Sequence, residues 1–339
     1  MRYDSAVPSV LVVNAGSTSV KLALVAPDEQ VTVPETIEEA ARDEVAAVGH
    51  RVVHGGSRFI QPTVIDDEVK GRIDALSVLA PLQNVATLRA IEEAQQLLPD
   101  LPHVAVFDTA FHATLPLEAS TYAVPGRWRK NWGIRRYGFH GLSVAWSTSQ
   151  VPVSRLVVCH LGGGCSITAV RDGRSIDTSM GFSPLEGVPM ATRSGTVDPG
   201  AIVYLMREEK LTIDEIDQAL EHESGLLGMG GATDPRELEH TLALDVYVYR
   251  IAAAVGAMAV ALGGLDAIVF TAGVGEHSAP VRGAVCRRLA FLGVDLDENA
   301  NASAEADCDI STPGSPVRVA VVKAREELVI AREVRSLGL

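Results

Sequence analysis

The sequence predicts an α/β protein made of two similar halves, each opening with a β-hairpin. The chain has 339 residues, which is more than one hydrophobic core usually serves. Residues 11–25 (LVVNAGSTSVKLALV) resemble residues 156–170 (LVVCHLGGGCSITAV), and strand and helix patterns alternate after each copy. We therefore expect a duplicated fold, with one domain over residues 1–146, a second over residues 147–339, and a cleft between them.

The two matching segments align without a gap. Each begins with Leu-Val-Val, passes through a turn of small residues and continues as an alternating apolar run. This pattern is typical of a β-hairpin. The alternative is two unrelated hairpins, which the position of the second copy disfavours because it starts where a second domain should begin.

The remaining elements follow from periodicity and capping residues. Strands are expected at residues 48–54, 104–107, 174–178, 267–271 and 317–322, and helical patterns cover residues 67–98, 198–207, 235–262 and 326–336. Asp234, Pro235 and Glu237 suit the start of the third helix, as cap, first-turn proline and capping-box partner. We expect residues 301–316 to be an exposed loop, and the terminal helix to pack back on the first domain.

Composition restricts the partners and the compartment. A net charge of −14 argues against nucleic acid or an anionic membrane as a partner, because both require a basic surface. The four cysteines match no zinc pattern and are too few for a disulfide framework, which favours reduced thiols and a cytoplasmic location. Residues 1–9 show no secretion signal. The apolar stretch 251–265 is shorter than the ~20 residues of a membrane span, so we expect a buried helix.

Three turns rich in glycine or small residues are candidate phosphate sites. They lie at residues 14–19, followed by Lys21, at residues 160–164, and at residues 273–276 after a buried strand. Backbone N–H groups in such turns can approach phosphate oxygens closely. None of the three fits the Walker A or dinucleotide-binding pattern. A plain turn is the alternative for each.

Charged residues beside glycines are the second group of candidates. Arg51 and Arg193 are flanked by glycine and other small residues, and arginine is suited to bidentate binding of carboxylate or phosphate. Asp108 follows a buried strand, where ligand sites of α/β proteins gather. The alternatives are a surface ion pair for each arginine, a structural role for His140, and interaction with the helix dipole for Glu326.

Taken together, the motifs resemble those of one enzyme family. The segments VLVVNAGSTSVK, GHRVVHGG, VFDTAFH, IRRYGFHG, CHLGGG, MGFSPLEG, TRSG, AGVGE and EELVIA occur between residues 10 and 331 in the order that they take in acetate kinases and related propionate and butyrate kinases. The resemblance implies the duplicated fold of actin, Hsp70 and sugar kinases, and a homodimer. It also implies reversible, in-line transfer of the ATP γ-phosphoryl group to acetate, giving acetyl phosphate and ADP, with Mg²⁺ or Mn²⁺.

The resemblance also implies a role for individual residues. The metal ion would be held by Asn14 and Glu326, and the phosphate side lined by Ser17, Ser19 and Lys21. The carboxylate and the transferring phosphoryl group would be held by Arg51 and Arg193, with the charge stabilised by His140 near Asp108. ATP would be bound by His160, Leu161, Gly162, Gly163, Gly164, Asp234, Pro235, Arg236, Gly273, Val274, Gly275, Glu276 and His277. The acyl chain would enter an apolar pocket of Val53, Leu82, Phe139 and Pro184.

Several positions depart from the family pattern. Gly163, Cys165, His277, Gln83, Thr196 and Arg325 replace the family's usual residues, as do Leu142 and Val144, and the stretch at residues 26–47 is short. Other readings therefore stay open: a propionate or butyrate kinase, a different donor such as pyrophosphate, or a non-catalytic nucleotide-binding relative. A sugar or polyol kinase is disfavoured by the apolar pocket. A nicotinamide dehydrogenase is disfavoured by the glycine spacing.

Overall fold

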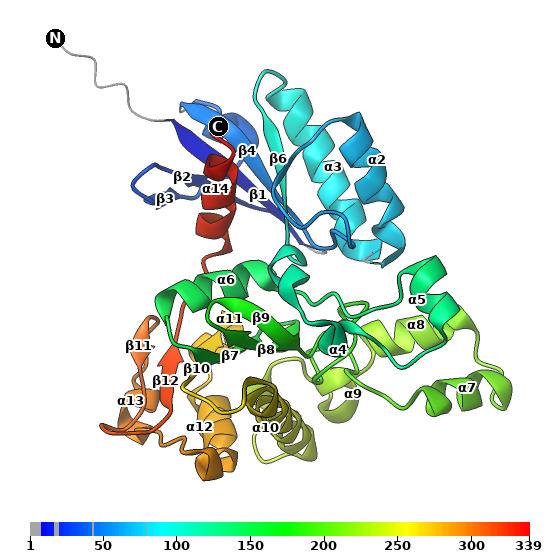
Figure 1. Cartoon of the computed structure of the whole chain (residues 1–339), viewed down its shortest axis with the longest axis vertical. Helices are drawn as coiled ribbons and strands as arrows, with labels where there is room; N and C mark the ends of the chain where they lie inside the picture. The colour runs from blue at the N-terminus through cyan, green and yellow to red at the C-terminus, as the bar shows by residue number, and fades with distance from the viewer. Residues whose placement is uncertain (1–7, 17–19, 43, 80) are drawn as a thin grey trace. The chain divides into compact units, whose positions relative to one another are not determined.

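Two compact α/β units make up the chain. The structure, a computed structural model, describes residues 8–16, 20–42, 44–79 and 81–339 (Figure 1). The first unit comprises the described residues up to Ala113, together with Phe139–Leu142 and Arg325–Leu339. The second comprises Thr114–Gly138 and Ser143–Ala324. The domain boundary between residues 146 and 147 stays a prediction.

A mixed six-stranded sheet forms the centre of the first unit. Its strands are β1 (Ser9–Ala15), β2 (Val20–Val25), β3 (Val31–Thr32), β4 (Val45–Val52), β5 (Thr63–Val64) and β6 (His103–Phe107), in the order β3-β2-β1-β4-β6-β5. Strands β1, β4 and β6 are parallel, whereas β2, β3 and β5 pair antiparallel to their neighbours. The α-helices are α1 (Ile37–Ala40), α2 (Asp67–Ala75), α3 (Pro81–Leu97) and α14 (Glu326–Ser336).

Strand β1 is buried on both faces of this sheet. Leu11 and Val13 cluster with Ala90 and Ala94 of α3. Helix α14 packs against β1 and β4, and Gly49 of β4 makes room for it. A Cβ at Gly49 would lie 2.7 Å from Ile330 Cγ2, so α14 approaches the backbone of the sheet closely.

The second unit repeats the sheet of the first. Its strands are β7 (Arg155–Leu161), β8 (Cys165–Arg171), β9 (Arg174–Thr178), β10 (Ala267–Thr271), β11 (Cys308–Asp309) and β12 (Arg318–Val321). From β9 the order is β9-β8-β7-β10-β12-β11, which matches β3-β2-β1-β4-β6-β5 in position. The parallel and antiparallel pairings match as well. The duplication predicted from the two hairpins is confirmed.

Helices cover the second sheet and extend beyond it. They are α4 (Leu117–Ser120), α5 (Gly126–Trp132), α6 (Gly141–Gln150), α7 (Pro199–Arg207), α8 (Ile213–His222), α9 (Gly225–Gly230), α10 (Leu242–Leu262), α11 (Ala272–His277), α12 (Ala279–Arg288) and α13 (Glu298–Ala302). Among the described residues, α10 is the one helix long and apolar enough to cross a membrane, and 44% of its apolar stretch is buried. It packs against β7 and β8.

The helix predicted over residues 235–262 is wrong in its first turns. Pro235–Leu238 form a short 3₁₀ helix, η3, and α10 begins only at Leu242. The break lies at His240, whose φ of +62° is left-handed and cannot continue a right-handed helix. Thr241 then caps α10 by accepting from the Leu244 N–H. Asp234 accepts from the Arg236 N–H, so Asp234 caps η3 and not a long helix.

The expectation of an exposed loop at residues 301–316 is wrong only in part, because most of these residues are exposed or half-buried outside helices and strands. Asn301 is buried within α13, and Cys308–Asp309 form β11 against β12. The physical reason is Arg282, whose buried guanidinium needs acceptors and donates to the side chain and the carbonyl of Asn301 at 2.9 and 2.8 Å. The helical pattern at residues 67–98 is divided into α2 and α3.

The packing of α14 on β4 predicts a steric effect at Gly49. Gly49→Val would place methyl groups in space that Ile330 and Val334 occupy. We expect it to lower the free energy of unfolding by about 1–3 kcal/mol, measured by urea unfolding with circular dichroism. The control is Gly71→Ala in α2, where a Cβ has no neighbour within 4 Å. This change should be neutral or stabilising by about 0.5–1 kcal/mol. Equal effects at both positions would contradict the packing.

Candidate active site

Polar side chains of the first unit meet at the carboxyl ends of three parallel strands. Asn14 lies near the end of β1, Arg51 near the end of β4, and Asp108 directly after β6. Glu326 begins α14, which packs on β1 and β4. Because β1, β4 and β6 are adjacent and parallel, their carboxyl ends share one edge of the sheet. Residues far apart in sequence therefore form one group.

Arg51 is the centre of this group. Its Nη2 and Nε donate to Asp108 Oδ2 at 2.5 and 3.1 Å. Its Nη1 donates to Asn14 Oδ1 at 3.3 Å, and its Nε lies 3.7 Å from Glu326 Oε2. Asn14 closes the ring by donating from Nδ2 to Glu326 at 3.0 Å. These contacts fix the planar guanidinium in one orientation, which is the preorganisation that anion binding requires.

Burial and charge act in opposite directions on this ion pair. Burial raises the pKa of the Asp108 carboxyl to about 6, and the Arg51 guanidinium opposes this rise. Burial also opposes the charge on Arg51, but the carboxylates of Asp108 and Glu326 outweigh it and raise the pKa of Arg51 above its ordinary value. Above about pH 6 the pair is therefore ionised. Asp108 Oδ1 is buried without a hydrogen-bond partner among the residues that the structure describes.

Residues 139–142 lie beside the group. The Gly141 N–H donates to the Asp108 carbonyl at 3.1 Å, and a Cβ at Gly141 would lie only 2.0 Å from that oxygen. Glycine is therefore required for this approach. The preceding residue, His140, has a φ of +57°, a conformation that non-glycine residues rarely adopt. This left-handed backbone at His140 directly precedes the contact between Gly141 and the Asp108 backbone. Such conformations are often found at functional positions.

The second unit contains a hollow of about 390 Å³ that joins three predicted segments. It is lined by Gly162, Gly163, Ala191, Thr233, Asp234, Pro235, Arg236, Gly273, Val274, His277 and Ser278. A Cβ added at Gly163 or Gly273 would have no neighbour within 4 Å, so the backbone at both positions faces open space. The three nucleotide-binding segments predicted from the sequence therefore converge on one hollow, although they come from different parts of the chain.

Buried side chains hold the glycine turn between β7 and β8 (residues 162–164). Cys165 Sγ lies 3.4 Å from the Gly162 carbonyl, to which it donates, and 3.2 Å from the hydroxyl of Tyr247 on α10. Burial raises the pKa of Cys165, so the thiol stays protonated and able to donate. His160 Nδ1 lies 2.8 Å from Ser143 Oγ. Together with the hydrogen bond from the Gly162 N–H to the Gly164 carbonyl at 3.0 Å, these contacts fix the shape of the turn.

Arg193 lies in a loop of the same unit. Its Nη1 donates to the Pro184 carbonyl at 2.7 Å, and its Nε lies 3.8 Å from Glu221 Oε2. The loop also touches the glycine turn, because the Ala191 N–H donates to the Gly163 carbonyl at 3.3 Å. Arg193 and Pro184, both predicted site residues, are therefore direct neighbours.

The other predicted site residues are spread over several elements of the two units. Ser17 and Ser19 lie outside the described residues, as does the side chain of Leu82 at the start of α3. Val53 and Phe139 are both buried, and Phe139 packs edge-on against the ring of His54. Lys21 is exposed on β2. Leu161 is buried at the end of β7, and Gly164 is in the turn that follows. Gly275 and Glu276 are buried in α11.

Sequence reasoning missed two residues that position this machinery. Asn84 is fully buried, and its side chain accepts from the N–H and donates to the carbonyl of His54, which fixes the chain just beyond β4. Ser143 contacts His160. Asn84 gave no signal in the sequence, because it stands beside Gln83 in a helix that mixes polar and apolar residues. Ser143 gave none, because its partner lies in another element.

Comparison with known proteins agrees with this geometry. A family model described as the acetokinase family matches residues 31–332. The chain belongs to the acetokinase family. It is therefore a phosphotransferase with a carboxyl group as acceptor. An acetate kinase of Deinococcus radiodurans is 51% identical to this chain over 312 residues, which is 86% of this chain and 78% of the relative.

Solved structures of two relatives share the fold of this chain. A propionate kinase of Francisella tularensis superposes with a TM-score of 0.89 at 36% identity, over 96% of this chain and 99% of that one. An acetate kinase of Porphyromonas gingivalis gives a TM-score of 0.85 at 35% identity, over 98% and 100% of the two chains. The predicted fold class, a duplicated α/β fold of the actin-like ATPase type, is confirmed.

The raised pKa of Asp108 predicts a pH dependence of stability. A pKa of about 6 in the folded state exceeds the ordinary value of about 4, so the folded state binds more protons between these values. Wild type should lose stability relative to Asp108→Asn as the pH rises from 4 to 6, and the difference should be constant above pH 7. Urea unfolding of both proteins across this range measures it. If wild type instead gained stability relative to Asp108→Asn in this window, the effect of Arg51 on the pKa of Asp108 would outweigh the effect of burial.

The geometry of the hollow predicts that a larger side chain at residue 163 would lower the affinity for a nucleotide. Gly163→Val places its side chain in open space, so the fold should be unchanged while the hollow is narrowed. We expect ADP affinity to fall by about tenfold or more, measured by calorimetry. The matched control is Gly256→Ala on α10, which also has open space at its Cβ but does not line the hollow. Unchanged ADP affinity in Gly163→Val would contradict the assignment.

Proposed function

We propose that this protein catalyses reversible transfer of the ATP γ-phosphoryl group to acetate, giving acetyl phosphate and ADP. The supporting observation is the oriented Arg51, held by Asp108, Asn14 and Glu326 at the carboxyl ends of three parallel strands. The names of the relatives, acetate and propionate kinases, agree with a short carboxylate as the acceptor.

A carboxylate acceptor sets the demands on this site. The acceptor is already an anion at neutral pH, so its attacking oxygen needs no general base. The difficulty is repulsion between two anions, and fixed cations reduce it. We assign that role to Arg51 and Arg193, with His140 stabilising the charge that develops on the transferring group. Asp108 acts through Arg51 as a positioning residue, since its carboxylate holds the guanidinium and not the substrate.

The proposed step is a single in-line displacement. A carboxylate oxygen of acetate forms a bond to the γ-phosphorus, and the bond from that phosphorus to the β,γ-bridging oxygen breaks. The electron pair of the broken bond stays on the bridging oxygen, which leaves as part of ADP. No proton transfer is required in either direction. Positioning and charge neutralisation therefore account for the whole contribution of the protein.

The residues present suit a magnesium or manganese ion. Both ions prefer oxygen ligands, and Mg²⁺ usually keeps several waters and binds through one or two carboxylates plus substrate phosphates. Asn14 and Glu326 offer an amide oxygen and a carboxylate, and the unpartnered Oδ1 of Asp108 is a further oxygen of the same group within the described residues. When bound, the ion would neutralise phosphate charge. Asn14 and Glu326 would hold it.

The donor nucleotide belongs, in this proposal, to the hollow of the second unit. The backbone of residues 162–164 would face the phosphates, and residues 234–236 and 273–277 would face the adenosine. Asp234 and Arg236 form an ion pair at 2.5 Å on the rim of the hollow. Loss of the charged group of the first unit, or of the hollow of the second, should therefore abolish turnover.

Propionate is a second acceptor candidate, favoured by the TM-score of 0.89 to a propionate kinase. One methylene in an apolar pocket is worth only about 1–3 kcal/mol, so both acids can be substrates at different rates. We also propose, from family membership, a homodimer in the cytoplasm with no nucleic-acid or membrane partner.

The proposal predicts a specific loss in Arg51→Lys. Lysine keeps the charge but cannot make the contacts of the planar guanidinium with Asp108 and Asn14. We expect acyl phosphate formation, trapped as the hydroxamate, to fall by at least about 100-fold, with ADP affinity within twofold of wild type. Arg89→Lys, an exposed position on α3, is the control and should be unaffected. Wild-type turnover in Arg51→Lys would remove the basis of the proposal.

A further inference from the structure

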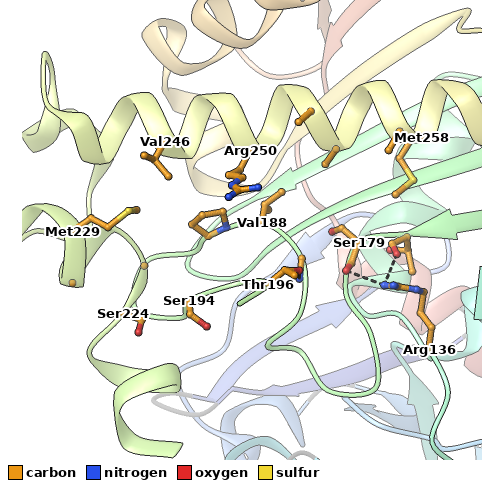
Figure 2. A pocket seen from close by; sticks show the side chains of 18 of the residues that line it. Arg136, Ser179, Val188, Ser194, Thr196, Ser224, Met229, Val246, Arg250 and Met258 are labelled. Atoms are coloured by element: carbon orange, nitrogen blue, oxygen red, sulfur yellow. Dashed lines mark hydrogen bonds between the residues drawn. The ribbon is translucent and has the colours of Figure 1, made fainter. Parts of the chain in front are cut away.

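Helix α8 and the start of α9 lie against the segment that carries Arg193. Residues 220–226 make hydrogen bonds to residues 190–194, although the two segments are far apart along the chain. Figure 2 shows Ser194 on one of these segments and Ser224 on the other. These neighbours determine whether the side chain of Arg193 is free to move or is held in one place.

Hydrogen bonds fix the backbone on both sides of Arg193. The Ser194 N–H donates to the Leu220 carbonyl at 3.0 Å, and Thr192 Oγ1 donates to the Glu221 carbonyl at 2.8 Å. Both acceptors belong to the last turn of α8, where carbonyl groups have no partner within the helix. The end of α8 therefore holds the two residues that flank Arg193 in the chain.

The start of α9 adds to this support. The Leu226 N–H donates to the Met190 carbonyl at 2.9 Å. Gly225 makes the close approach possible, because its φ is +61° and a Cβ at this position would lie 2.7 Å from the Arg193 carbonyl. A residue with a side chain would displace the segment. The backbone of Arg193 is thus fixed from α8 and from α9.

Two oxygen atoms hold the side chain of Arg193. Its Nη1 donates to the Pro184 carbonyl at 2.7 Å, and its Nε lies 3.8 Å from Glu221 Oε2. The exposed fractions of the Arg193 and Glu221 side chains are only 18% and 22%, so water screens their attraction less than at an open surface. Among the described residues Nη2 has no hydrogen bond, which leaves it for an anionic substrate.

Arg51, the other arginine of the proposed site, is held in a similar way. Its Nε donates to the carboxylate of Asp108, and its Nη1 donates to the amide oxygen of Asn14. In both arginines a carboxylate therefore faces Nε, and a neutral oxygen accepts from an Nη group. Glu221 has the same place relative to Arg193 that Asp108 has relative to Arg51.

We propose that Glu221 is a positioning residue for Arg193 in the transfer reaction, an inference that rests on the proposed function. The carboxylate attracts the Nε side of the guanidinium while the Pro184 carbonyl holds Nη1, so two contacts fix the plane of the group. Without the carboxylate one contact remains, and the guanidinium can turn about it. A displacement of about 1 Å can cost about 100-fold in rate, because the cation must meet the charge of the transition state.

The kinetic test is Glu221→Gln, which keeps the size of the side chain and removes its charge. We expect kcat for acyl phosphate formation from Mg-ATP and acetate to fall by about tenfold or more. The ADP affinity and the midpoint of urea unfolding should stay at the wild-type values, because Glu221 does not touch the nucleotide hollow. The control is Asp217→Asn, which removes a charge from an exposed position one turn earlier on α8 and should leave kcat unchanged.

A second measurement does not depend on the reaction. In protein labelled with ¹⁵N, the Nε–H signal of Arg193 reports how firmly the guanidinium is held, and its absence in Arg193→Lys identifies it. We expect slow exchange of this proton with water in wild type and in Asp217→Asn, and faster exchange in Glu221→Gln.

Three results would overturn the inference. They are a wild-type kcat in Glu221→Gln, an unchanged exchange rate of the Nε–H proton in this variant, and a parallel loss of kcat, ADP affinity and unfolding midpoint, which would show a general structural role. If wild type forms no acyl phosphate, the proposed function fails instead. The exchange rates then still decide whether Glu221 holds Arg193.

Discussion

The ion pair between Arg51 and Asp108 is the contact on which the proposed site depends. An unpaired aspartate carboxylate would be costly to bury at the end of β6, and an arginine without partners would sample many rotamers. Together they offset each other's desolvation and fix the guanidinium. Such pairs contribute little net stability, because desolvation cancels much of the attraction. Their value here is orientation, which a reaction between two anions requires.

The duplicated sheet explains why this pair can form. Parallel strands β1, β4 and β6 bring their carboxyl ends to one edge, and α14 adds Glu326 from the end of the chain. Strand β7 occupies the position in the second sheet that β1 has in the first, and it leads instead into the glycine turn. One topology therefore serves two purposes: charged side chains follow the strands of the first unit, while bare backbone follows β7.

Much of this organisation could be predicted from the sequence because it is local. The two hairpins have period-two patterns around small-residue turns, and Asp108 follows a recognisable buried strand. What could not be predicted depends on contacts between distant residues. The left-handed His240 divides a continuous apolar pattern, and the bond of Asn84 to His54 joins an unremarkable helix to β4. The buried Arg282 orders Asn301, which resembles a loop residue in sequence.

Three departures from the family pattern, Gly163, Cys165 and His277, lie at or beside the hollow of the second unit, whereas others, such as Arg325 next to Glu326, lie in the first unit. The members of the charged group themselves are kept. Gly163 opens the hollow, and Cys165 replaces a hydroxyl by a thiol that still holds the Gly162 carbonyl. This combination favours an active enzyme over a binding relative that has lost its chemistry, because the costly buried ion pair is retained.

The most direct test of this account is ³¹P NMR of the wild-type protein with Mg-ATP, with and without acetate. The account predicts that the γ-phosphorus signal of ATP is converted to an acyl phosphate signal only when acetate is present, in step with the appearance of ADP. Two results would contradict it. One is hydrolysis of ATP to inorganic phosphate whether or not acetate is present, and the other is ATP that binds to the protein but is not converted.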